Sequence, residues 1–243
     1  MPTLSIVIPS FNEEKRLPET IKSLKVFVES SECPFEVEAI IIVDDGSSDH
    51  TLQVAQGLKA EWPIIKIEEH KINLGKGAAV HKGMQSAVGE WILIADADMA
   101  TPWDQLLKLQ KHIKNAQVVI GSRRVKESEI IRRQSLVRLS MGRIFNLLVK
   151  ILLPLKFEDT QCGFKLIQND FFFRNQILSE LKVAGFAWDV EMLLWVKLKD
   201  KVTVEVPIRW QHQTLSRVRL YSDSLDMVIS LIELRSRYLR SKR

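Results

Sequence analysis

The chain of 243 residues contains only two cysteines, Cys33 and Cys162, and no cysteine pattern with the spacing of a zinc site. A framework of disulfide bonds is therefore excluded, and so few cysteines are typical of a protein in a reducing compartment. The five histidines show no ligand spacing either, and we interpret them as non-functional. We interpret Cys162 as a packing residue, because its surroundings in the sequence offer no histidine that would activate the thiol.

Long apolar runs are also lacking. The longest spans residues 144–155 and is interrupted by Asn146 and Lys150, which makes it too short and too polar to cross a bilayer. The first residues have a strand pattern, without the basic and apolar stretches of a secretory signal. Because 46% of the residues are hydrophobic and 27% are charged, the chain has enough apolar material for an ordinary core. We expect a single domain, residues 1–243, in the cytoplasm.

Several common enzyme motifs are missing. The turn at residues 75–77 has the sequence Gly-Lys-Gly, without the upstream glycine and the Ser or Thr of a P-loop. No Gly-x-Gly-x-x-Gly follows the first expected strand, which argues against a dinucleotide site. Neither the His-Glu-x-x-His of zinc proteases nor the Gly-x-Ser-x-Gly of esterases occurs, so these two classes have no support.

The net charge of +5 is distributed unevenly. Residues 123–156 contain nine Lys and Arg against two Glu, and residues 235–243 contain five more basic residues without an acid. The rest of the chain is therefore net acidic. Localised positive charge among apolar residues favours an anionic membrane surface or a phosphate ligand. A nucleic-acid-binding protein is the alternative from another class, but no platform of aromatic and basic residues supports it.

What the sequence does contain is a regular alternation of strand and helix patterns. Strands are predicted at residues 4–8, 37–43, 64–67, 91–95 and 118–121. Helices are predicted between them, the first at residues 14–29. This spacing is typical of βαβ units, so we expect an α/β fold with a mostly parallel central sheet and helices on both faces.

Polar residues follow the predicted strands, and the most informative are Asp96 and Asp98. They end the apolar stretch that begins at Trp91. In an extended chain, the Asp-x-Asp spacing places both carboxylates on one side, where they repel each other unless a positive group lies between them. A divalent cation with bound phosphate meets that need. The alternative is that both are solvated loop residues.

The other strand ends complete a site for a nucleotide diphosphate, because ligands of such sheets bind beyond the carboxyl ends of the strands. Asp44 or Asp45 is placed to accept hydrogen bonds from a base or ribose. Arg123 and Lys76 are placed to neutralise phosphate oxygens.

Four motifs together resemble glycosyltransferase family 2 and its GT-A fold, which is Rossmann-like, in order and in spacing. They are Ile8-Pro9-Ser10-Phe11-Asn12-Glu13-Glu14, Val43-Asp44-Asp45-Gly46-Ser47-Ser48-Asp49, Asn73-Leu74-Gly75-Lys76-Gly77 and Asp96-Ala97-Asp98. Residues 159–166, 186–191, 216–218 and 222–238 resemble the subgroup that glycosylates polyprenyl phosphates, and are most similar to dolichyl-phosphate β-glucosyltransferases. The chain departs from this subgroup at Arg217, where the subgroup often has Lys, and in having no membrane-spanning segment.

The resemblance implies a role for particular residues. A base pocket would be lined by Pro9, Phe11, Glu13 and Asp44. Asp96-Ala97-Asp98 would bind the donor diphosphate, with Asp96 and Asp98 as ligands of Mg²⁺ or Mn²⁺. The phosphates of donor or acceptor would contact Lys76, Arg123, Arg138 and Arg217. Asp159 would lie near the sugar and the acceptor, with a helix cap as the alternative, whereas we interpret Asp189 as scaffold.

The activity that follows is metal-assisted transfer of glucose from UDP-glucose to a polyprenyl or dolichyl phosphate, with inversion at the anomeric carbon. GDP-mannose is the alternative donor, and a soluble molecule is the alternative acceptor. Residues 130–155 form a basic amphipathic segment and residues 222–243 a basic C-terminal helix. We expect the first to lie in a membrane interface, with a core helix as the alternative. The protein would then be peripherally bound to the cytoplasmic face of a membrane.

Overall fold

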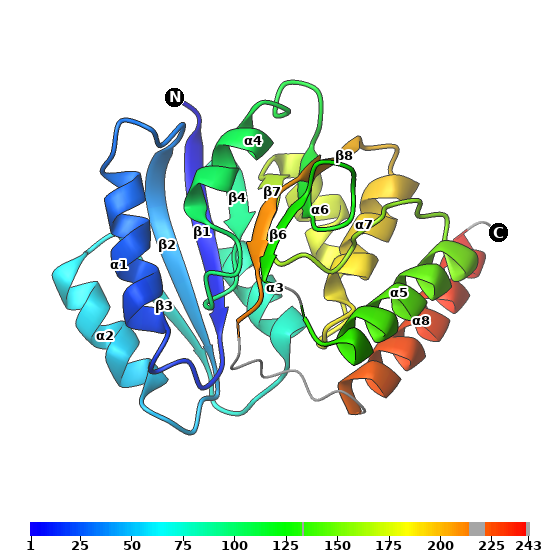
Figure 1. Ribbon diagram of the computed structural model, residues 1–243, viewed down its shortest axis with the longest axis horizontal. Helices are drawn as coiled ribbons and strands as arrows, with labels where there is room; N and C mark the ends of the chain where they lie inside the picture. The colour runs from blue at the N-terminus through cyan, green and yellow to red at the C-terminus, as the bar shows by residue number, and fades with distance from the viewer. Residues whose placement is uncertain (133, 214–221, 242–243) are drawn as a thin grey trace.

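The computed structural model describes residues 1–132, 134–213 and 222–241, and a central sheet runs through the described part (Figure 1). Its strands are β1 (Thr3–Ser10), β2 (Glu36–Asp45), β3 (Ile65–His70), β4 (Trp91–Ile94), β5 (Val118–Ser122), β7 (Lys165–Gln168) and β8 (Thr203–Pro207). Their order across the sheet is β3-β2-β1-β4-β7-β5-β8. All neighbours are parallel except β7, which is antiparallel to both β4 and β5. The predicted α/β class with a mostly parallel sheet is confirmed.

The five predicted strands correspond to β1–β5, whereas β7 and β8 were not predicted. β7 has only four residues, and it begins with a fully buried lysine, Lys165, in place of an apolar residue. β8 lies at the edge of the sheet and alternates apolar and polar residues. One of its polar residues, Glu205, accepts hydrogen bonds from the backbone of the loop before β7.

Helices cover both faces of the sheet. They are α1 (Leu17–Val28), α2 (Thr51–Glu61), α3 (Lys76–Ser86), α4 (Leu106–Gln110), α5 (Leu136–Leu152), α6 (Phe171–Gln176), α7 (Trp188–Leu198) and α8 (Ser222–Ser241). Short 3₁₀ turns occur at Trp103–Gln105 and Leu178–Glu180. Helix α1 is shorter than predicted at its start, because residues 11–16 form the turn after β1.

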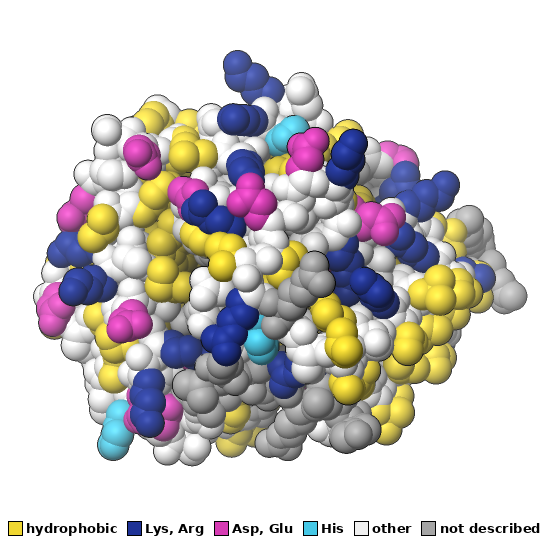
Figure 2. All heavy atoms as spheres, viewed as in Figure 1, with side chains coloured by type: hydrophobic (Ala, Val, Ile, Leu, Met, Phe, Trp, Pro, Cys, Tyr) yellow, Lys and Arg dark blue, Asp and Glu magenta, His cyan; other side chains and the backbone are white. Residues whose placement is uncertain are grey.

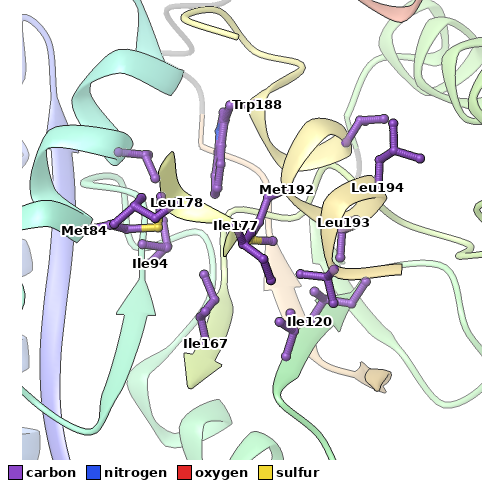
Figure 3. Packing of buried hydrophobic residues seen from close by; sticks show 14 of the residues in the cluster. Met84, Ile94, Ile120, Ile167, Ile177, Leu178, Trp188, Met192, Leu193 and Leu194 are labelled. Carbon is purple, nitrogen blue, oxygen red and sulfur yellow. The ribbon is translucent and has the colours of Figure 1, made fainter. Parts of the chain in front are cut away.

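Alternate residues of the buried strands enter two separate cores, as the two-residue period of a strand requires. Ile6, Ile40 and Leu93 pack with α1, α2 and α4 on one face. Val7, Ile41 and Ile94 pack on the other face with α3, α5, α7 and α8. Figure 3 shows this second core, in which Trp188 and Met192 of α7 lie beside Met84 of α3 and Ile94 of β4. Each fully buried side chain of this size contributes about 1.5–3 kcal/mol.

The basic amphipathic segment predicted at residues 130–155 is divided between two elements. Its first residues lie in β6 (Glu129–Arg132), which pairs with β9 (Arg209–Gln211) in a small parallel sheet, and most of the rest forms α5. Helix α5 packs against α8 at one end of the molecule (Figure 1). The Arg235 guanidinium of α8 donates to the carbonyl of Leu152, 2.8 Å away, and so binds one of the open carbonyls at the end of α5.

In the described part of the chain, we find no helix with both the length and the apolar character that crossing a bilayer requires. Helix α8 is long enough, but charged residues interrupt its apolar stripe.

Candidate active site

The chain turns directly after β4, at the edge of the sheet where the strands of the parallel part end. Ala95 still donates a backbone hydrogen bond to Val7, but residues 97 and 98 form a turn, and Met99 has a φ angle of +53°. The Asp98 Oδ1 atom accepts a hydrogen bond from the backbone N–H of Ala100 at 3.0 Å. The Asp-x-Asp stretch is therefore not extended as we expected, yet both of its carboxylates line the same two cavities.

Asp96 forms an ion pair with Lys76, the first residue of α3. The Lys76 Nζ atom lies 2.6 Å from the Asp96 Oδ1 atom. Burial by itself would lower the pKa of Lys76, but Asp96 raises it above its usual value. Burial would likewise raise the pKa of Asp96, but Lys76, followed by Lys165 and Arg123, lowers it. Both members of the pair are therefore charged at neutral pH.

Gly163 fixes the other side of the Asp96 carboxylate. It lies in the loop before β7, and a Cβ atom on this residue would lie 2.1 Å from the Asp96 Oδ2 atom. No real side chain tolerates that approach, so any other residue at position 163 displaces the carboxylate. Asp96 is thus held between a lysine on one side and a bare backbone on the other.

Asp98 has a different electrostatic environment. Burial raises its pKa, and the neighbouring charge of Asp96 raises it further. Arg16 and Lys76 lower this pKa only in part, so the ionised form of Asp98 is one that a bound cation would stabilise further.

A cavity of about 300 Å³ lies at the ends of β1, β2 and β4. Its lining brings together Pro9, Phe11, Glu13, Lys76, Asp96, Ala97 and Asp98, all of which the sequence predicted as donor-binding residues. It also includes Asp45, which the sequence offered as the alternative to Asp44, and Arg16, Phe186 and Asp223, which were not assigned to the site. Arg16 could have been found from its spacing, because it lies one helical turn after Glu13 and forms an ion pair with it.

The two aspartates after β2 have different surroundings. Asp45 holds the loop before α3 in place, because its carboxylate binds His70, Asn73 and the backbone N–H groups of residues 74 and 75. Asp44 is also buried, and its Oδ2 atom accepts only a weak hydrogen bond from Ser47 at 3.3 Å. Its Oδ1 atom is buried without a partner. A buried acceptor of this kind is costly unless something binds it. Asp44 lies outside the lining of the smaller cavity, however, whereas its neighbour Asp45 is part of that lining.

A second and larger cavity, of about 420 Å³, lies on the other side of the carboxylates. It shares Lys76, Asp96, Asp98 and Phe186 with the first cavity. Its walls come from α5, including Arg138, Leu139, Ile144, Phe145 and Leu148, and from α8, including Ser224, Met227 and Val228. The sequence predicted a membrane-interface segment where α5 lies and a basic helix where α8 lies, but it did not show that the two helices enclose a cavity. Their pairing joins segments that are about 80 residues apart, and no local pattern predicts it.

Arg123 lines the larger cavity, whereas Asp159 lines neither. The Asp159 carboxylate is buried and accepts from the Arg123 Nε atom at 2.6 Å, the Arg123 Nη2 atom at 2.8 Å and the Arg123 backbone at 3.0 Å. Although burial opposes its charge, Arg123 holds the pKa of Asp159 well below its usual range. The Arg123 guanidinium also lies 5.3 Å from the centre of the Trp210 ring. In this structure, Asp159 contacts Arg123 and fixes its position.

Asp189, which we interpreted as scaffold, lines the larger cavity at the start of α7. Its carboxylate lies 3.3 Å from the buried Nζ atom of Lys165 and accepts from the Gln161 amide at 2.5 Å. Burial raises the pKa of Asp189 despite the nearby Lys165. Asp189 is thus a structural partner of Lys165 that also lines the larger cavity. The aromatic residues around it in the sequence did not indicate this second role.

Of the remaining residues from the sequence analysis, Arg138 and Cys162 can be placed and Arg217 cannot. Arg138 lies in the first turn of α5 and lines the larger cavity. Arg217 lies outside the described residues. Cys162 is buried, and burial raises the pKa of its thiol to about 11, in agreement with its interpretation as a packing residue.

Comparison with known proteins places the chain in a family. The family model "Glycosyl transferase family 2" matches residues 5–173. The mouse dolichyl-phosphate β-glucosyltransferase is 36% identical over 248 residues, which cover 97% of this chain and 76% of the mouse protein. The Saccharomyces cerevisiae dolichyl-phosphate β-glucosyltransferase is 33% identical over 258 residues, with 97% and 75% covered.

Solved structures share the fold. Glucosyl-3-phosphoglycerate synthase from Mycobacterium tuberculosis, in complex with UDP, superposes with a TM-score of 0.68 at 17% identity, over 97% of this chain and 80% of that one. The same enzyme in complex with Mn²⁺, UDP and glucosyl-3-phosphoglycerate gives a TM-score of 0.69 at 18% identity over the same shares. This likeness confirms the predicted GT-A fold class. Together with the sequence match over most of its length, it shows that the chain belongs to glycosyl transferase family 2.

Proposed function

We propose that this protein transfers glucose from UDP-glucose to a polyprenyl or dolichyl phosphate, with inversion at the anomeric carbon. The names of its sequence relatives support the lipid phosphate and the glucose. The observation that carries the proposal is the pair of cavities that meet at Lys76, Asp96, Asp98 and Phe186. A donor in one cavity and an acceptor in the other would bring their reacting atoms together at this junction.

The smaller cavity is assigned to the donor. Phe11 and Pro9 line the cavity and would offer apolar contact to a base. The unpartnered Oδ1 atom of Asp44, the residue next to the cavity residue Asp45, would accept a hydrogen bond from the nucleoside. Lys76 at the start of α3 provides a positive charge for the diphosphate.

Mg²⁺ or Mn²⁺ is assigned to Asp96 and Asp98. The raised pKa of Asp98 and the two carboxylates at the cavity junction fit a cation with hard oxygen ligands. Within the described residues, no group of three or more His, Cys, Asp and Glu could hold a metal ion, so the donor diphosphate would complete its coordination. The bound ion would neutralise the charge that develops on the leaving UDP.

The larger cavity is assigned to the lipid phosphate. Arg123 and Arg138 face it and would bind the phosphate, while Leu139, Phe145 and Met227 would contact the first isoprene units. We assign Asp159 to positioning the Arg123 guanidinium, since its carboxylate contacts Arg123 and lies outside both cavities.

These residues would promote a direct displacement. An acceptor phosphate is already ionised near neutral pH, so its oxygen needs no strong general base to act as a nucleophile. It would attack the anomeric carbon from the side of the larger cavity while the bond from that carbon to the UDP oxygen breaks, and UDP would leave on the side of the smaller cavity. Positioning by the two arginines and neutralisation of charge would lower the barrier.

Peripheral binding to the cytoplasmic face of a membrane is the second part of the proposal. Helices α5 and α8 each present an apolar stripe to solvent, in addition to the residues that they bury (Figure 2). The stripes consist of Leu136, Val137, Ile144, Leu147 and Ile151 on α5, and Leu225, Ile229, Ile232 and Leu239 on α8. Because the same helices enclose the larger cavity, this surface would bring the cavity to the lipid. The basic residues of both helices add attraction to anionic headgroups, about 1 kcal/mol each.

The test is a transfer assay with radiolabelled donor. The protein is incubated with Mn²⁺, UDP-glucose or GDP-mannose, and either polyprenyl phosphate in anionic liposomes or the soluble acceptor 3-phosphoglycerate. We expect label in the lipid fraction only with UDP-glucose and polyprenyl phosphate. Transfer from GDP-mannose would overturn the donor assignment. Transfer to 3-phosphoglycerate but not to lipid would overturn the lipid acceptor and leave a soluble glycosyltransferase.

A further inference from the structure

We propose that Lys76 occupies the metal site of the free enzyme as an internal counter-ion and moves from Asp96 to the donor diphosphate when the metal and nucleotide bind. This inference rests on the donor and metal assignments above and adds that binding of the metal depends on binding of the donor. The free protein would bind a divalent cation weakly, and the nucleotide would open the site for it. Lys76 would therefore couple metal binding to donor binding.

The first observation is the ion pair itself. The Lys76 Nζ atom lies 2.6 Å from the Asp96 Oδ1 atom, which is a bonding distance for an ammonium group and a carboxylate. The Asp98 Oδ1 atom is also engaged, by the backbone N–H of Ala100. A cation arriving alone would meet two carboxylates, one of which is already neutralised, and no third acidic or histidine ligand within the described residues.

The second observation is that the backbone around Lys76 is fixed, so the exchange requires only side-chain motion. Gly75 has a φ angle of +103°, and a Cβ atom there would lie 2.6 Å from the carbonyl oxygen of Ala184. That same carbonyl accepts a hydrogen bond from the backbone N–H of Ala78 at 3.1 Å. The first turn of α3 is therefore held in place, while the flexible stem of the lysine carries its charge at the junction of the two cavities.

The third observation is that the site and the donor diphosphate together would hold a partner of opposite charge for both Lys76 and the cation. Lys76, Asp96 and Asp98 all line the smaller cavity, to which the donor is assigned. A nucleotide diphosphate brings oxygen ligands for the cation and a strong acceptor for the ammonium group at the same time. The exchange would replace one lysine–carboxylate pair by a cation–carboxylate pair and a lysine–phosphate pair, so no charge would be left without a partner.

The test measures Mn²⁺ binding to the free protein, from the electron paramagnetic resonance signal of free Mn²⁺ and without nucleotide. Removing the lysine charge should strengthen Mn²⁺ binding, because a unit charge a few ångströms away repels the cation strongly. We expect Lys76→Met to bind Mn²⁺ at least about tenfold more tightly than the natural protein. The matched control is Lys82→Met in the same helix, whose ammonium group contacts Glu68 and the carbonyl of Glu69 away from both cavities, and it should not change the affinity.

Two further measurements complete the test. Adding Asp98→Asn to Lys76→Met should abolish the gain, which shows that the ion binds at this site, and Lys76→Gln serves as a second charge-removing variant if Lys76→Met does not fold. In the presence of Mn²⁺, Lys76→Met should bind UDP at least about fivefold more weakly, because the diphosphate loses its lysine partner. Unchanged or weaker Mn²⁺ binding by the folded Lys76 variants would overturn the exchange. Failure of the natural protein to bind UDP with Mn²⁺ would instead overturn the proposed function.

Discussion

The two cavities share four residues but are built in different ways. The smaller one lies at the ends of β1, β2 and β4, and its positions are fixed by the sheet and by hydrogen bonds such as those of Asp45. The larger one is walled by α5 and α8, two helices that bury few residues each and pack on one another at the end of the molecule. The first is a polar site at the edge of the sheet, and the second is a mostly apolar site beside two helices, with charged residues at its junction with the first.

This difference suggests that donor and acceptor recognition are separable. A nucleotide diphosphate needs charges at fixed positions, and the end of a parallel sheet supplies them. An isoprenoid chain needs apolar area and access from a membrane, and a pair of amphipathic helices supplies both. Changes in one region should therefore affect one substrate, and only changes at the shared junction should affect both.

The largest effect is expected at the junction. Asp98→Asn should reduce transfer by about three orders of magnitude or more, because it removes charge from the assigned metal site without touching the core. Transfer assays and thermal unfolding are measured together. Asp226→Asn on the exposed face of α8 is the control and should leave the rate unchanged. Full activity of folded Asp98→Asn would remove this residue from the mechanism.

Gly163→Ala should also act at the junction, by displacing the Asp96 carboxylate from a backbone position that lines the larger cavity. The added Cβ atom would lie 2.1 Å from the Asp96 carboxylate, so we expect a loss of transfer of about a hundredfold together with a lower unfolding temperature. Gly57→Ala in α2 is the matched control, since no atom lies within 4 Å of its Cβ position. It should stabilise the helix by up to about 1 kcal/mol. Equal effects of the two substitutions would contradict the close approach to Asp96.

Asp44→Ala should weaken only the donor side. A lost interaction with the nucleoside costs about 1–3 kcal/mol, or about five- to 150-fold in UDP affinity. Calorimetric titration with UDP in the presence of Mn²⁺ gives the affinity, and the KM for the lipid acceptor should stay the same. Since the Oδ1 atom of Asp44 has no partner in the free protein, little stability should be lost. Unchanged UDP affinity would show that the nucleoside binds elsewhere.

A smaller effect is expected at the exposed apolar stripes of α5 and α8, which we assign to membrane binding. The pair Leu147→Ser and Ile151→Ser removes two exposed apolar side chains from α5 and should reduce binding to anionic liposomes by about tenfold, while UDP binding is unchanged. Val26→Ser is the control, because Val26 is equally exposed on α1, at the other end of the molecule. Reversing the charges of Arg132 and Arg143, together with that of Arg133, which lies outside the described residues, should reduce the salt-sensitive share of binding. Flotation of the liposomes measures both, and equal loss in the Val26 variant would contradict a specific surface.

The two cavities also differ in how many of their residues and elements could be predicted from the sequence. Asp96 and Asp98 were predicted from local patterns, because parallel strands that end at one edge bring their following residues together. The roles of Pro9, Phe11 and Glu13 came instead from the resemblance to glycosyltransferase family 2. The acceptor side depends on contacts between distant segments. The antiparallel β7 was not predicted, because it is short and its buried Lys165 interrupts the apolar pattern of a strand. The cavity between α5 and α8 was not predicted either, because it depends on the packing of these two helices. Asp159 was assigned a place near the sugar, but only its contacts indicate that it positions Arg123.

The most direct test of the two-cavity account is to fill the larger cavity and measure both substrates. Met227→Trp would place a bulky ring between α5 and α8, beyond the reach of the smaller cavity, whose lining does not include Met227. The account predicts that the KM for polyprenyl phosphate rises at least about tenfold while the affinity for UDP with Mn²⁺ stays within about twofold. An unchanged acceptor KM, or a matching loss of UDP affinity in the folded variant, would contradict it.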